Sequence, residues 1–84
     1  MNTAHTERVK GTRAVAERWA QAHQRFVEFA MEHAGLTRDE ANAAAGYMVK
    51  IKVVKLDPIG GQFHAKHGLY LEPDVLRRAA KLGA

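Results

Sequence analysis

One short stretch, VVKLDPIGGQFHAKHG (residues 53–68), constrains the fold more than any other part of the chain. It interrupts an alanine-rich sequence and joins two segments of alternating pattern through Asp-Pro-Ile-Gly-Gly. Proline fixes its own φ and glycine tolerates positive φ, so this pentapeptide has the composition of a turn. The pattern predicts a β-hairpin whose returning strand has Phe63 and Ala65 on one face and His64 and Lys66 on the other.

The segment before the hairpin begins with a long helical pattern. Apolar residues recur at spacings of three and four over residues 13–34, among them Trp19 and Phe26, which indicates an amphipathic helix. The residues before it are polar and include glycine. We therefore expect a mobile N-terminal tail over residues 1–12 and a single small domain over residues 13–84.

A second helix should follow the first after a tight turn. Gly35 has the place of a helix C′ glycine, and Thr37 with Glu40 forms the T-x-x-E pattern of a capping box. Residues 49–57, VKIKVVKLD, are β-branched and alternate with lysine, so this helix should pass into the first strand near Lys52. Pro73 suits the first turn of a last helix.

These elements predict an α+β domain, rich in helix, with the order helix–helix–β-hairpin–helix. A winged-helix-like arrangement is one version of it. A two-stranded hairpin is marginal alone, so it should pack on the helices. The expected core consists of Trp19, Phe26, Ala30, Ala44, Met48, Ile51, Val54, Leu56, Phe63, Leu71, Val75 and Leu76.

Composition narrows the function. The 84 residues contain no cysteine, so disulfides are excluded, and no serine, so a serine nucleophile is excluded as well. Glu28 and Glu32 share a helix face, but such a pair is more often solvated charge than an acid–base couple. We expect no catalytic residues and no enzyme. The chain lacks an apolar run long enough for a membrane and an apolar signal-peptide core, so we expect a cytoplasmic protein with no membrane contact.

Neither a cofactor site nor a metal site is predicted. Gly60-Gly61 lacks the P-loop and dinucleotide-binding spacings, and a strand should follow it, so a turn is the better interpretation. His64 and His67 have an H-x-x-H spacing, but residues i and i+3 of a strand point to opposite faces. No cysteine is present to complete a zinc site.

The charge distribution points to a polyanionic partner. The formal net charge is +4, and residues 50–67 contribute three of these charges, with four lysines against Asp57. A local basic patch suits nucleic acid, although a solvated lysine face has the same composition. The turn at residues 35–37 also has the rough form of a helix-turn-helix elbow, with the hairpin in the place of a wing.

In that arrangement two residues, Arg38 and Asn42, lie on the exposed face of the second helix. The acidic start of this helix, Asp39 and Glu40, disfavours base reading, so contact with phosphates is the better prediction. The candidate nucleic-acid or partner-binding residues are Arg38, Asn42, Lys50, Lys52, Lys55, His64 and Lys66.

The C-terminal half also resembles small, largely uncharacterised proteins encoded by bacteriophages and prophages. The resemblance covers about 35 residues and is carried by Lys55-Leu56-Asp57, Gly61, Phe63, Lys66-His67-Gly68 and Leu71 through Ala79. It implies a phage context inside a host cell and a protein that acts by binding, and it transfers no catalytic residue.

Three functions are compatible with these observations. The first is a non-enzymatic phage accessory protein whose basic hairpin contacts the DNA backbone. The second is an anti-CRISPR-like inhibitor that binds a host defence protein or complex. The third is a phage structural or assembly component. A homodimer would also bury apolar surface that the small core leaves over.

Overall fold

The computed structural model describes the backbone of residues 3–84 and the side chains of residues 12–84. In this range the elements are α1 (Thr3–Ala34), α2 (Arg38–Lys50), β1 (Val54–Leu56), β2 (Phe63–Ala65), the 3₁₀ helix η1 (Gly68–Leu71) and α3 (Pro73–Gly83). The strands are antiparallel neighbours. The predicted α+β order is thereby confirmed, whereas the 3₁₀ helix was not expected.

Helix α1 begins ten residues earlier than the amphipathic pattern indicates. The apolar periodicity starts near residue 13, yet the backbone is helical from Thr3. Helix formation is cooperative, so a helix fixed at one end by packing can propagate into a segment that has no apolar stripe of its own. The mobility predicted for residues 1–12 stays a prediction. Residues 1–2 lie outside the described part of the chain.

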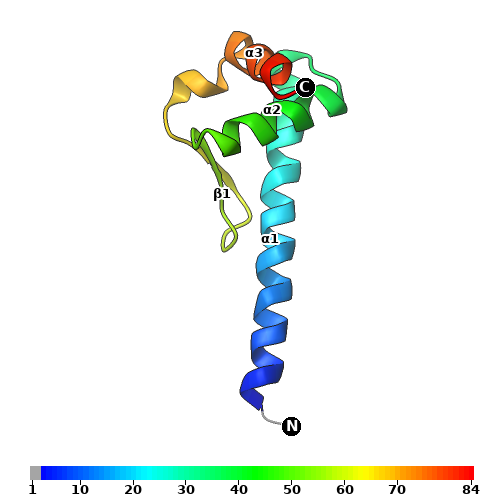
Figure 1. The fold of residues 1–84 in the computed structure, drawn as a ribbon, viewed down its shortest axis with the longest axis vertical. Helices are drawn as coiled ribbons and strands as arrows, with labels where there is room; N and C mark the ends of the chain where they lie inside the picture. The colour runs from blue at the N-terminus through cyan, green and yellow to red at the C-terminus, as the bar shows by residue number, and fades with distance from the viewer. Residues whose placement is uncertain (1–2) are drawn as a thin grey trace.

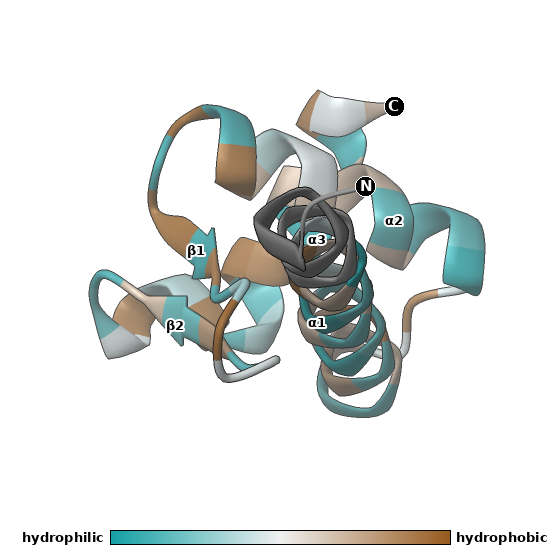
Figure 2. Ribbon diagram, turned by 90° about the horizontal axis from the view of Figure 1, so that it is seen from below, coloured by the Kyte–Doolittle hydropathy of each residue, from teal (hydrophilic) through white to brown (hydrophobic). Residues whose placement is uncertain are grey.

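The elements gather around the C-terminal part of α1 (Figure 1). Helices α2 and α3 pack across its end, and the hairpin lies beside its middle turns. The N-terminal turns of α1 project away from the other elements, which gives the molecule extents of 52 × 23 × 19 Å. Viewed along α1, the hairpin lies to one side of the helix (Figure 2).

The core forms where the three α-helices meet and is rich in alanine. Its largest fully buried side chains are Phe26, Val27, Met48 and Leu76. Alanines on all three helices fill most of the rest, and they let the helix backbones approach closely. At Gly83 of α3 this approach is extreme, because an added β-carbon would clash with the carbonyl oxygen of Ala43 in α2.

Seven of the twelve predicted core residues are buried, three (Phe63, Leu71 and Val75) are partly buried, and two are exposed. Trp19 and Ile51 each retain 46% of their surface exposed. Trp19 lies one turn before Ala22, where the packing of α1 begins, so part of the ring extends past its neighbours. Ile51 is the C-cap of α2 and follows the last helical residue. Periodicity places both on an apolar stripe but says nothing of where the covering elements end.

Side-chain hydrogen bonds fix the helix ends near the core. The predicted capping box is present, with Thr37 Oγ1 accepting from the Glu40 amide at 3.2 Å and Glu40 Oε1 accepting from the Thr37 amide at 2.9 Å. These bonds hold the pKa of Glu40 below its ordinary value of 4.5. Arg77 of α3 donates from Nε to the Ala34 carbonyl at 3.0 Å, which satisfies an end carbonyl of α1.

The hairpin turn is held on α1 by two arginines. Arg18 Nη1 donates to the Ile59 carbonyl at 2.7 Å, and Arg25 Nη1 donates to the Gly61 carbonyl at 2.8 Å. Gly61 has φ +70, and an added β-carbon would lie 2.9 Å from Gln21 Oε1. The turn therefore requires glycine for its backbone and for its close approach to the helix.

Within the part of the chain searched, no helix is long and apolar enough to cross a membrane.

Candidate nucleic-acid interface

The hairpin register places Lys55 directly opposite His64 on its outer face. Both side chains are exposed, whereas Val54 and Leu56 on the inner face are buried at 3% and 5% exposure. Residues that face one another in an antiparallel pair have β-carbons about 5 Å apart. The alternation predicted from the sequence is thus present, and it brings two of the candidate residues side by side.

Asp57 introduces a negative charge next to this pair. Its Oδ1 accepts from the Ile59 amide at 2.8 Å, and its Oδ2 lies 3.7 Å from His64 Nε2. Hydrogen bonds from the Ile59 and Gly60 amides, with a smaller effect of His64, lower the pKa of Asp57 below its ordinary value of 3.8. The carboxylate is therefore ionised at neutral pH, and it offsets part of the positive charge on the outer face.

Lys52 occupies an unusual backbone position at the end of α2. Its φ is +66, and its amide donates to the Val49 carbonyl at 3.1 Å. The next amide, that of Val53, donates to the Met48 carbonyl at 3.0 Å. These two bonds make a Schellman motif, in which the left-handed residue is usually glycine. Lysine at this position has a strained backbone conformation, and its exposed side chain lies between α2 and β1.

The candidate residues of α2 form a row along its surface. Arg38, Asn42 and Lys50 are exposed and fall on the i, i+4 spacing, with exposed Gly46 between the last two. At a rise of about 1.5 Å per residue, the row places Arg38 roughly 18 Å from Lys50. Lys50 therefore continues toward the hairpin, whereas Arg38 and Asn42 lie at the far end of the helix.

The remaining lysines lie against two separate hollows. Lys52 and Lys55 line one together with Trp19 and Val49. Lys66 lines the other with Tyr70 and neighbouring residues that follow β2. All seven candidate residues are exposed, but the structure does not gather them into one cluster. Lys52 and Lys55 share their concave surface with the exposed residue Trp19.

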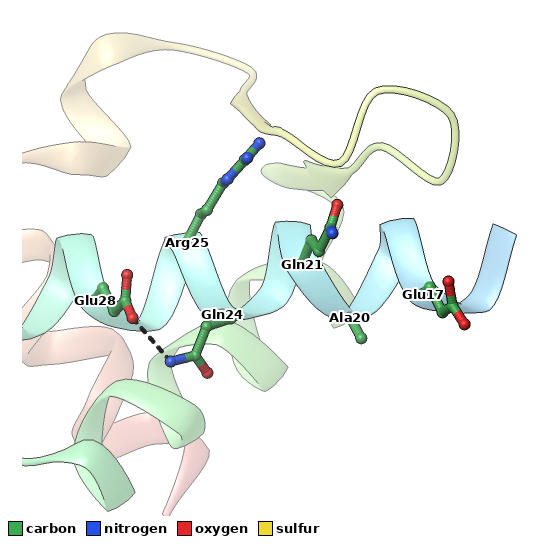
Figure 3. Close-up of a pocket in the computed structure, with 6 residues that line it drawn as sticks. All are labelled: Glu17, Ala20, Gln21, Gln24, Arg25 and Glu28. Atoms are coloured by element: carbon green, nitrogen blue, oxygen red, sulfur yellow. Dashed lines mark hydrogen bonds between the residues drawn. The ribbon is translucent and has the colours of Figure 1, made fainter. Parts of the chain in front are cut away.

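A third hollow runs along α1 but offers no convergent chemistry (Figure 3). Arg25 extends from the helix toward the hairpin, which it binds, while Glu28 lies on another side. Glu28 accepts from Gln24 Nε2 at 2.9 Å. Carboxylate, amide and guanidinium groups here belong to local contacts of the helix, and they do not point at a common centre.

The two histidines of the H-x-x-H spacing have separate local contacts. His64 faces Asp57 across 3.7 Å, and His67 Nδ1 accepts from the Leu69 amide at 3.1 Å, where it caps η1. Among the residues searched for metal ligands, no three His, Asp or Glu side chains lie close enough to hold an ion. His64 is thus an exposed residue of β2, and His67 makes a local hydrogen bond at the end of this strand.

Sequence reasoning missed Trp19 as a surface residue and missed the arginines that hold the hairpin. For the arginines a signal exists, since Arg18, Gln21 and Arg25 follow a helical spacing of three and four and form a polar ridge. For the exposure of Trp19 the sequence contains no signal, because an exposed residue can continue the apolar stripe that buried residues form.

Comparisons with protein-family models, with curated proteins and with solved structures find no match to this chain. The resemblance to phage-encoded proteins therefore stays a prediction.

Proposed function

We propose that the protein binds nucleic acid by contacting backbone phosphates with its basic hairpin and the adjoining end of α2. The observation that supports this most is the outer face of the hairpin, where exposed Lys55 lies directly opposite exposed His64. Three more lysines are exposed: Lys50 ends α2, Lys52 lies between α2 and β1, and Lys66 follows β2. None of the four lysines belongs to an ion pair with a described residue. Unpaired surface cations release the counterions of nucleic acid when they bind it.

A winged-helix-like mode of binding is the finer form of this proposal. Helix α2 would take the place of the helix that approaches the groove, with Arg38 and Asn42 toward it, and the hairpin would be the wing. Asp39 and Glu40 in the first turn of α2 repel phosphates near that end. Backbone contact through the hairpin is therefore the main component, and sequence reading is a minor one.

The test is the salt dependence of binding to a duplex. Lys55→Ala with Lys66→Ala should lower affinity and reduce the slope of log K against log salt by about 1.8, since each phosphate contact contributes about 0.9. Fluorescence anisotropy of a labelled oligonucleotide at several salt concentrations measures both quantities. Arg78→Ala with Lys81→Ala removes two exposed charges of α3 and is the matched control, which should leave most of the slope intact.

A slope that falls equally in both double variants would mean that only net charge matters and that the hairpin is no specific contact. Binding of neither duplex nor single strand at about 50 mM salt would contradict the proposal altogether. In that event a protein partner, as in the inhibitor or assembly alternatives, becomes the better explanation. A pull-down from host lysate with and without nuclease then separates a protein partner from one bridged by nucleic acid.

A further inference from the structure

Trp19 combines exposure with a defined surrounding. It is the one tryptophan of the chain, and 46% of its surface is exposed. Its ring stacks on His23 with centroids 5.8 Å apart and planes inclined by 17°. Together with the apolar residues Val49, Val54 and Leu56 it lines the hollow between α1, the end of α2 and β1. The ring thus has one side supported and part of its surface open.

Positive charge borders this hollow. Lys52 and Lys55 complete its lining, and both side chains are exposed. Lys52 has the left-handed backbone conformation that glycine adopts more easily. The backbone is therefore strained at a residue whose cationic side chain lines the hollow. An aromatic surface bordered by two lysines has the composition of a site for a nucleobase and its phosphates.

We propose that Trp19 is a stacking surface for an unpaired base and that Lys52 and Lys55 bind the adjacent phosphates. The inference rests on the proposed nucleic-acid binding and sharpens it, because it names single-stranded nucleic acid as the partner class. A duplex keeps its base faces stacked inside, so it can reach the lysines but cannot use the ring. A single strand can use both, and stacking on an aromatic side chain tolerates any base.

A second copy of the chain is the competing occupant. Val15, one turn before Trp19, is 47% exposed, so the apolar strip continues along α1. A two-fold contact over this strip would bring Lys52 and Lys55 near their own copies, and like charges at an interface disfavour such pairing. A polyanion neutralises these charges, so the charge of the hollow favours nucleic acid.

The experiment uses Trp19 as its own reporter. The full chain is titrated with an oligothymidylate, with a duplex of equal length, and with inorganic polyphosphate, while tryptophan emission is recorded. The anisotropy of the labelled oligothymidylate and of the labelled duplex measures binding without relying on Trp19. The single strand should quench or shift the emission of Trp19 and should bind more tightly than the duplex. The duplex and the polyphosphate should bind in a salt-sensitive manner with little change in emission.

Two variants extend the test. Trp19→Ala should weaken single-strand binding by about 5- to 150-fold and leave duplex binding within about two-fold, since stacking on one base has that range. Trp19→Phe keeps an aromatic face and should restore most of the affinity. Circular dichroism of both variants checks that they fold, and the Phe variant keeps the test valid where the Ala variant does not fold.

The outcomes separate this inference from the proposed function. Salt-sensitive binding of both nucleic acids, with unchanged Trp19 emission and unchanged affinity in Trp19→Ala, overturns the stacking site and leaves backbone binding standing. Absence of all binding overturns both. A change of Trp19 emission with protein concentration alone, matched by dimer formation in analytical ultracentrifugation, overturns the stacking site in favour of a second copy.

Discussion

Lys52 is the single non-glycine residue with positive φ in the described part of the chain. A left-handed conformation costs about 1–2 kcal/mol for a residue with a β-carbon, and glycine avoids most of this cost. The Schellman hydrogen bonds around Lys52 hold the conformation in place. At this position glycine would therefore stabilise the fold more than the lysine that is present.

Lys52→Gly should stabilise the folded protein by about 0.5–1 kcal/mol, because it removes the strain at a C′ position. Urea unfolding followed by circular dichroism measures the change. Lys50→Gly is the matched control: it removes the same charge two residues earlier, within the last turn of α2, and should destabilise by about 1 kcal/mol. Equal destabilisation by both substitutions would show that the left-handed lysine is not strained.

The same substitution connects stability with the proposed function. A more stable Lys52→Gly variant that binds nucleic acid less tightly would show that the lysine is retained for its charge.

At the scale of elements, the contact between the hairpin and α1 positions the basic outer face. Two strands of three residues each cannot be stable alone, and their inner residues cover only part of the core. Arg18 and Arg25 bind two carbonyls of the turn, and Gly61 lets the turn approach the helix. The orientation of Lys55 and His64 therefore depends on α1 as much as on the hairpin itself.

Gly61→Ala should destabilise the protein by about 1–3 kcal/mol, because the β-carbon would require both a strained φ and a displacement of Gln21. Thermal unfolding followed by circular dichroism gives the change. Gly68→Ala is the control, since nothing lies within 4 Å of its added β-carbon and its φ is not in the left-handed region. A Gly61 variant as stable as the Gly68 variant would mean that the turn does not rest on α1.

At the scale of the whole molecule, the packed part and the projecting part of α1 have different roles. From Ala22 onward the buried face of α1 joins a core built mainly of alanine with few large side chains. A chain of this size has a total stability of only about 4–13 kcal/mol, so each large core residue matters. Before Ala22 the described side chains of α1 are exposed, and among them Arg18 binds the hairpin turn.

Phe26 and Trp19 provide a direct comparison of the two parts. Phe26→Ala should destabilise by about 3–5 kcal/mol, because the ring is fully buried and meets Phe63 edge-on at 5.3 Å. Trp19→Ala should cost only about 1–2 kcal/mol, since 46% of the residue's surface is exposed. Urea unfolding of both variants measures the difference. A Trp19 variant that loses as much as the Phe26 variant would place the ring inside a larger interface.

Local features were predictable because their physics is local. The Thr37–Glu40 capping box, the C′ glycine at residue 35 and Pro73 at the start of α3 each depend on a few neighbouring atoms. The face of each hairpin residue followed from alternation alone. The first strand is shorter than the β-branched pattern, because the Schellman motif uses the residues up to Val53 for the end of α2.

The sequence by itself determined the order of the three α-helices and the hairpin, the turn, the face of each hairpin residue and the excess of lysine near the hairpin, because period, capping and turn chemistry act between close neighbours. The tertiary structure decided which parts of the apolar stripes are covered. That depends on where α2, α3 and the hairpin end against α1, and no local pattern encodes it. Trp19 shows the difference: its spacing assigns it to the core, and packing leaves half of it exposed beside Lys52 and Lys55.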